Sequence, residues 1–210
     1  MKDLVIIGAG GFGREVKELV DEINQDKPTW NFIGFVDDNA DVTVPEVDTV
    51  LGRIDYLLHI PQKPYVVISI ANAAVRKKYA ELFASEGFEF ATLIHPDVTI
   101  RGNRVKIGEG TIICSKTNIS INVQIGKHCI INTSCGFGHD TTVGDYCGFM
   151  PRTVLTGEVV VGDSCYFGVR STVINRINIT DHCTVGACAC VVKDLTESGT
   201  YVGIPAKRIK

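Results

Sequence analysis

From Ile107 to Val191, a large apolar residue returns at every sixth position without one slip in register. The residues on this spacing are Ile107, Ile113, Ile119, Ile125, Ile131, Phe137, Val143, Phe149, Leu155, Val161, Phe167, Val173, Ile179, Val185 and Val191. A helix repeats every 3.6 residues and a strand every two, so neither produces this spacing, whereas a repeat array does. The period predicts a left-handed parallel β-helix, in which each six-residue unit forms one side of a triangular prism and three units form a coil.

The position four residues after each large residue carries mostly small side chains. It holds five of the eight cysteines of the chain, namely Cys129, Cys135, Cys147, Cys165 and Cys183. A buried thiol packs like a small apolar group. The chain has no C-x2-C pair, which is the spacing that would indicate a zinc site. We therefore expect these cysteines to pack inside the prism, and we expect no bound metal. Glycine often follows the large residue directly, and we expect those glycines to take the unusual backbone angles of the corners.

The first ninety residues have a different pattern, in which strands alternate with helices. Strands are expected at 4–8, 32–36, 65–70 and 89–94, and helices at 12–24 and 73–86. Asn72 is placed to cap the second helix and Gly87 to close it. We predict an α/β Rossmann-like half-domain over residues 1–92, followed by the all-β left-handed β-helix over residues 93–210.

A glycine-rich turn joins the first strand to the first helix. Gly8, Gly10 and Gly13 fit the pattern G-x-G-x-x-G, and the second strand ends at Asp37-Asp38. The start of the helix would offer free N–H groups to a phosphate, and Asp37 can accept from a ribose hydroxyl or a base N–H. A dinucleotide usually needs two such halves, so one half favours a single nucleotide, such as a nucleotide diphosphate carrying a sugar. In the alternative, the glycines only make a tight turn and the acids only end a strand.

Charge and hydropathy argue against two classes of partner. The formal net charge is -3 without a basic stripe, so we expect no nucleic-acid binding. No apolar run approaches the roughly 18 residues of a membrane span. The opening MKDLVIIGAGGFG carries an acid at position 3 and breaks into glycines, unlike a secretory signal. We therefore expect a cytoplasmic protein.

His139 and Asp140 interrupt the repeat with a potential acid–base pair. The inward positions of their unit are Phe137 and Thr141, so the pair should lie near a corner and point away from the core. Histidine accepts a proton near neutral pH, and an adjacent carboxylate favours the imidazolium and fixes the ring. The alternative is a solvated surface residue, which is what we expect of His128 and His182 at other corners.

Several segments together resemble a known family. They are VIIGAGGFGREV, FVDDN, LIHPDV, NTSCGFGHDTTVGDY, VGACACVVKDL and GIPAK, and they span the whole chain. The chain resembles the hexapeptide-repeat acyltransferases of the sialic-acid O-acetyltransferase type, which include the bacterial UDP-4-amino-sugar N-acetyltransferases. The resemblance implies a homotrimer with sites between neighbouring subunits, acetyl-CoA lying along the β-helix, and a nucleotide-linked amino sugar bound by the N-terminal domain.

The resemblance also implies roles for single residues. His139 would be the general base, Asp140 would raise its basicity, and Asn132 would orient the substrate. The predicted substrate contacts are Gly10, Gly11, Phe12, Asp37, Asp38 and Ala71. The predicted coenzyme contacts are Gly148, Val169 and Ala187. Two positions depart from the family pattern, since some relatives have histidine in place of Gly148, and the run VGACAC carries Cys188 and Cys190 where the usual run is Gly-Ala-Gly-Ala.

Together these features predict acetyl-CoA-dependent N-acetylation of a nucleotide-linked 4-amino-4,6-dideoxy sugar in glycan or surface-polysaccharide synthesis. O-acetylation of sialic acid or a related sugar would use the same base and coenzyme, and stays open. A γ-type carbonic anhydrase needs three converging histidines, which the spacing of His128 and His139 does not provide. A nicotinamide oxidoreductase would rest on the glycine turn alone. A noncatalytic scaffold would not depend on His139.

Overall fold

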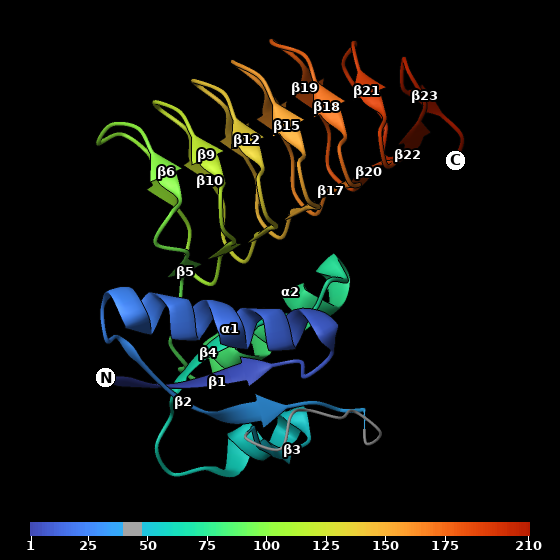
Figure 1. Ribbon diagram of the computed structural model, residues 1–210. Coiled ribbons are helices and arrows are strands. Elements are labelled where there is room, and N and C mark those ends of the chain that lie inside the picture. The colour runs from blue at the N-terminus through green and yellow to red at the C-terminus, as the bar shows by residue number, and fades with distance from the viewer. Residues whose placement is uncertain (40–47) are drawn as a thin grey trace. The chain divides into compact units, whose positions relative to one another are not determined.

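The computed structural model describes residues 1–39 and 48–210 (Figure 1). The chain divides into two compact units, Met1–Pro96 and Asp97–Lys210. Within the described residues, no helix is both long and apolar enough to cross a membrane.

The first unit is a parallel sheet with helical connections, as the sequence pattern predicts. Its strands follow the order β3-β2-β1-β4. Its elements are β1 (Lys2–Ile7), α1 (Gly11–Asp26), β2 (Trp30–Val36), β3 (Val50–Gly52), the 3-10 helix η1 (Ile54–His59), β4 (Tyr65–Ile68), α2 (Ala73–Ser85) and β5 (Leu93–Ile94). The helix α1 lies along one face of the sheet and packs against β1 and β2 (Figure 1). The residues from Leu4 to Ile7 are fully buried, as expected for the central strand of a parallel sheet.

Most helices and strands of this unit lie where the sequence pattern predicts them. The side chain of Asn72 accepts from the backbone N–H of Val75 at 3.1 Å and caps α2, as predicted. The strand expected at 89–94 is wrong in extent, since only a bridge from Phe90 to Val66 and the short β5 form there. The short elements β3 and η1 follow from packing against β2, and no local pattern indicated them.

The second unit is a left-handed parallel β-helix, as predicted from the six-residue period. Its strands form three sheets. The first contains β7 (Lys106–Ile107), β10 (Gln124–Ile125), β13 (Thr142–Val143), β16 (Val160–Val161) and β19 (Asn178–Ile179). The second contains β8 (Ile112–Ile113), β11 (Ile130–Ile131), β14 (Gly148–Phe149), β17 (Tyr166–Phe167), β20 (Cys183–Val185), β22 (Gly199–Val202) and β23 (Lys207–Arg208). The third contains β6 (Thr99–Ile100), β9 (Asn118–Ile119), β12 (Gly136–Phe137), β15 (Val154–Leu155), β18 (Thr172–Val173) and β21 (Cys190–Val191). Figure 1 shows these short strands repeating from coil to coil.

The interior of the prism holds both sets of repeated residues. The large apolar residues from Ile113 to Val191 are all buried. Cys129, Cys147, Cys165 and Cys183 form a ladder one coil apart, and each thiol donates to a backbone carbonyl of the following coil. Burial raises the pKa of the Cys135 thiol to about 12. The prediction that these cysteines pack inside is confirmed.

The corners differ from the prediction. The left-handed residues stand three positions after each large residue, where φ lies between 52° and 64° from Lys116 to Cys188. The glycines directly after the large residues do not adopt left-handed angles; they are required because the next coil lies too close. A Cβ on Gly108 would come within 2.5 Å of the backbone carbon of Gly126, and one on Gly138 within 2.5 Å of the Gly157 nitrogen.

The left-handed residues define three edges of the prism. The His139 edge carries Asn122, Asp140, Glu158 and Arg176. The Val169 edge carries Ser134, Arg152, Arg170 and Cys188. The third edge carries His128, Tyr146, Ser164 and His182.

The prediction that His128 is a solvated residue is wrong, whereas His182 is exposed. His128 is only 3% exposed, and its ring stacks on that of Tyr146 with centroids 5.4 Å apart. The residue one coil before it is Gly110, where a Cβ would come within 2.5 Å of the His128 Cε1 atom. A glycine on one side and an aromatic ring on the other therefore let the imidazole lie flat against the prism.

Candidate functional site

His139 and Asp140 form a pair at the corner between β12 and β13. The Nδ1 atom of His139 lies 2.8 Å from the Oδ2 atom of Asp140, and the two side chains are 54% and 48% exposed. Asp140 has a φ of 58°, which turns the chain out of the strand. The Asp140 N–H donates to Ile121 and the His139 carbonyl accepts from Glu158, so the coils before and after hold this corner.

The imidazole rests over a glycine of the following coil. A Cβ on Gly157 would lie 2.5 Å from the His139 Nε2 atom, so only glycine leaves the ring its place. Within the described residues, Nε2 makes no hydrogen bond. An ionised Asp140 accepts the proton of Nδ1, so the neutral ring presents Nε2 as an acceptor. The pair can therefore take a proton from a bound group at Nε2.

Asn122, which the sequence reasoning did not identify, completes this arrangement. Its Nδ2 atom donates to the Oδ1 atom of Asp140 at 2.8 Å. This hydrogen bond, followed by the one from His139, holds the pKa of Asp140 below its usual value. The signal in the sequence is the spacing of 18 residues, which stacks position 122 against position 140.

The predicted coenzyme contacts lie elsewhere on the prism. Val169 and Ala187 are exposed and occupy equivalent places one coil apart on the Val169 edge, where the N–H of Cys188 donates to the Val169 carbonyl at 2.8 Å. Gly148 is buried in β14. The face formed by β9, β12, β15 and β18 separates the Val169 edge from His139. One chain therefore does not bring the candidate base and these residues together.

Asn132 also lies outside the His139–Asp140 pair. Its Oδ1 atom accepts from the backbone N–H of Thr133 at 2.7 Å, next to the Val169 edge. Among the described residues, it shares no hydrogen bond with His139. Its place matches that of the coenzyme contacts more closely than that of the base.

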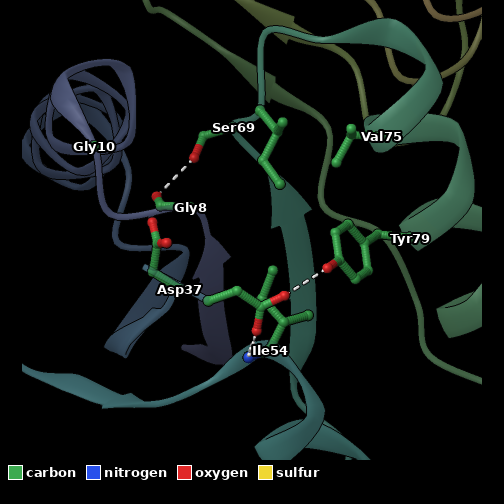
Figure 2. Close-up of a pocket in the computed structure, with 9 residues that line it drawn as sticks. Gly8, Gly10, Asp37, Ile54, Ser69, Val75 and Tyr79 are labelled. Carbon is green, nitrogen blue, oxygen red and sulfur yellow. Dashed lines mark hydrogen bonds between the residues drawn. The ribbon is translucent and has the colours of Figure 1, made fainter. Parts of the chain in front are cut away.

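A second candidate site lies in the first unit, at the carboxyl ends of its strands (Figure 2). It is a pocket of about 320 Å³, lined among others by Gly8, Gly10, Asp37, Asp38 and Tyr79. Three predicted substrate contacts, Gly10, Asp37 and Asp38, thus line one pocket. The other three, Gly11, Phe12 and Ala71, are not among the lining residues.

The glycines of this pocket have two different roles. Gly8 has a φ of 102°, and a Cβ on Gly13 would lie 2.9 Å from the Gly8 carbonyl carbon, so these two let α1 start close to β1. A Cβ on Gly10 or Gly11 would meet nothing within 4 Å. Gly10 caps α1 without a side-chain hydrogen bond, so the helix start stays open to a ligand.

The two acids at the end of β2 also differ. Asp37 accepts from the backbone N–H groups of Ala9 at 2.7 Å and Asn39 at 2.8 Å, so it braces the glycine turn. Asp38 accepts from the backbone N–H of Ile54 at 3.1 Å and from the Tyr79 hydroxyl at 2.7 Å. The bond to Asp38 raises the pKa of Tyr79 to about 12 and lowers that of Asp38.

Tyr79 and Arg76 are further residues that the sequence reasoning missed. Tyr79 follows Val75 by one helical turn, and both line the pocket from α2. Arg76 is buried, and its guanidinium donates to the carbonyls of Ile70 at 2.7 Å and Ala71 at 3.0 Å. Arg76 thereby holds the loop that carries Ala71.

In residues 1–39 and 48–210, no group of three or more His, Cys, Asp or Glu side chains can hold a metal ion.

Comparisons with known sequences identify one family model and two curated relatives. The family model described as the PglD N-terminal domain matches residues 3–83. The chain is 32% identical over 122 residues to the UDP-N-acetylbacillosamine N-acetyltransferase of Bacillus subtilis (strain 168), which covers 54% of this chain and 51% of that protein. The chain thus spans about half the length of the curated relatives that it matches.

Solved structures extend the likeness to the whole chain. The acetyltransferase domain of PglB from Neisseria gonorrhoeae FA1090 superimposes with a TM-score of 0.91 at 27% identity, covering 100% of both chains. PerB from Caulobacter crescentus, solved in complex with CoA and GDP-perosamine, gives a TM-score of 0.86 at 30% identity and covers 100% of this chain and 98% of its own. The chain belongs to the hexapeptide-repeat acyltransferase family that includes the bacterial nucleotide-linked amino-sugar N-acetyltransferases.

Proposed function

We propose that this protein is an acetyl-CoA-dependent N-acetyltransferase that acts on a nucleotide-linked 4-amino-4,6-dideoxy sugar. The observation that carries the proposal is the exposed His139–Asp140 pair with its free Nε2 atom. The pair lies on a fold similar to that of PerB, which was solved in complex with CoA and GDP-perosamine. The name of the Bacillus subtilis relative points to the same class of acceptor. CoA and a nucleotide-linked sugar are cytoplasmic metabolites, so the reaction is expected in the cytoplasm.

In this proposal His139 moves one proton. The sugar amine attacks the thioester carbonyl, a C–N bond forms, and the C–S bond breaks. His139 Nε2 accepts the proton that the amine loses and returns it to the departing thiolate. Asp140 holds the ring by Nδ1 and stabilises the imidazolium while it carries the proton.

The pocket of the first unit is proposed to hold the nucleotide. The open start of α1 suits phosphate oxygens, since its N–H groups have no side-chain cap. The Asp38–Tyr79 pair offers hydrogen-bonding groups for a ribose or a base. Gly11, Phe12 and Ala71 remain proposed contacts beside this pocket.

The proposal includes a homotrimer. Because Val169 and Ala187 lie on a different edge from His139, a coenzyme on the Val169 edge needs a base from another copy. A closed ring of three copies can place the His139 edge of one beside the Val169 edge of the next. Asn132 is proposed to belong to the same coenzyme-side surface, and Gly148 to lie beneath it.

The test is thiol release from acetyl-CoA with a panel of UDP-, GDP- and dTDP-linked 4-amino sugars, with free sialic acid as a further acceptor. We expect release with at least one nucleotide-linked amino sugar, and an acetamide in the product by mass spectrometry. Release with sialic acid and with no amino sugar would favour O-acetylation and overturn the proposal.

A further inference from the structure

Asn122 stands directly against the candidate catalytic pair. Positions 122 and 140 are one coil apart, and the pairing of Gln124 with Thr142 fixes the register between them. Both residues are left-handed, with φ values of 59° and 58°. The same corner geometry repeated in successive coils therefore directs the Asn122 amide at the Asp140 carboxylate, with Nδ2 and Oδ1 2.8 Å apart.

The orientation of the Asn122 amide indicates a strong interaction. Its Oδ1 atom is buried and has no hydrogen-bond partner among the described residues. A buried polar atom without a partner is costly, and a hydrogen bond to an ionised carboxylate is stronger than one between neutral groups. The amide thus leaves its oxygen unsatisfied in order to donate to Asp140.

The consequence for Asp140 is a fixed carboxylate. One oxygen accepts from Asn122 at 2.8 Å, and the other lies 2.8 Å from His139 Nδ1. A half-exposed aspartate with one such partner is free to rotate about its last torsion, whereas one held at both oxygens is not. Asn122 therefore determines where the carboxylate directs the imidazole.

Asn122 also lies where a ligand can reach. Together with Asp140, Gln124 and Thr142 it lines a groove of about 560 Å³ on the β7–β10–β13 face of the prism. The Asn122 amide and its partner, the Asp140 carboxylate, thus face the same groove.

We propose that Asn122 is a positioning residue for the transfer reaction, which fixes Asp140 so that His139 presents Nε2 to the acceptor amine; this role rests on the proposed function. Asn122 itself does not touch the reacting atoms. Its contribution is the alignment of a side chain that would otherwise move, so its loss should slow turnover without weakening the binding of either substrate.

The test uses two substitutions and a matched control. Asn122→Gly removes the amide without backbone strain, because glycine adopts left-handed angles freely. Asn122→Asp keeps the shape but replaces the donor with a second carboxylate. The control is Arg176→Gly, on the same edge with a φ of 62°, which removes the bond from Arg176 Nε to Glu158 Oε1 at 3.2 Å.

We expect Asn122→Gly to lower kcat about tenfold while both KM values stay within about twofold of the wild type. The reason is that the lost hydrogen bond aligns the Asp140 carboxylate and does not contact either substrate. The pKa of Asp140 should rise towards its ordinary value, because the hydrogen bond that favours its ionised form is lost. Asn122→Asp should lower kcat further, and Arg176→Gly should match the wild type. Nitrogen NMR of the His139 ring should show one dominant Nδ1–H form in the wild type and a mixture of forms in Asn122→Gly.

An unchanged kcat in Asn122→Gly would overturn the proposal, as would an equal loss in Asn122→Gly and Arg176→Gly. If the wild type transfers acetyl to no acceptor, the proposed function fails, and the ring NMR then decides the positioning role alone. In that case a ring signal unchanged by Asn122→Gly would reject the role.

Discussion

At the scale of single residues, the candidate base depends on neighbours that are distant in sequence. His139 and Asp140 are adjacent, but Asn122 precedes Asp140 by one coil and Gly157 follows His139 by one coil. The hexad register made it possible to predict from the sequence that the pair points out of the core. Asn122 and Gly157 were not predicted, because recognising them needs the stacking of coils as well as the repeat within the chain.

The space over Gly157 gives a first prediction. Its Cβ in Gly157→Ala would lie 2.5 Å from His139 Nε2, so the exposed ring must move away from its place. We expect kcat to fall by about tenfold or more, as for loss of an aligned proton acceptor. The melting temperature should stay close to that of the wild type, since the displaced group is at the surface. A wild-type kcat in this variant would show that the ring position is not required.

The Asp38–Tyr79 pair gives a prediction about pH. The carboxylate and partial burial raise the pKa of Tyr79 to about 12, so an ultraviolet titration should show this phenol ionising well above the ordinary pH for tyrosine. Tyr79→Phe should remove the component near pH 12 and raise the pKa of Asp38. Because the folded pKa is raised, the stabilisation is present below about pH 10 and is lost as pH rises through about 12. Loss of a component near pH 10 in its place would contradict the assignment.

At the scale of elements, the six-residue repeat predicted the β-helix correctly. It did not predict which residues form the corners or why the glycines are required. A six-residue period predicts a prism because the large side chain of every unit then points into the same interior, where all of them pack together. It could not tell which corner residue turns left-handed, because Lys116, Asp140 and Arg170 all occupy that place with different side chains. The glycines that we expected to form the corners are instead required by the short distance between successive coils. In the first unit β3 and η1 escaped prediction, since neither has a period of its own.

The two glycines that flank Phe137 test this view of the coils. A Cβ on Gly138 would come within 2.5 Å of backbone in the next coil, whereas one on Gly136 would meet only Val154 at 3.7 Å. Overpacking of this kind costs about 1–3 kcal/mol, so Gly138→Ala should lower the melting temperature by several degrees. Gly136→Ala should leave it unchanged or slightly higher, because alanine restricts the unfolded chain. Equal melting temperatures in calorimetry would contradict the close approach of the coils.

At the scale of the whole molecule, the proposed reaction joins groups that one chain keeps apart. His139 projects from one edge of the prism, and Val169 and Ala187 lie along another. The β12 face between them is part of a rigid, close-packed coil, so folding of a single copy cannot close this gap. The proposed chemistry therefore makes assembly a condition of activity, and a variant that stays monomeric should be inactive with its fold intact.

The most direct measurement is activity in mixed assemblies. His139→Asn removes the base, and Ala187→Trp blocks the exposed coenzyme edge, so each variant alone should be inactive. Co-expressed with different tags and purified as mixed trimers, they should regain about one third of wild-type thiol release, since a ring of three copies then contains one complete site. Mixed trimers that remain inactive, or His139→Asn protein that is active alone, would contradict a site built from His139 of one copy and the coenzyme edge of the next.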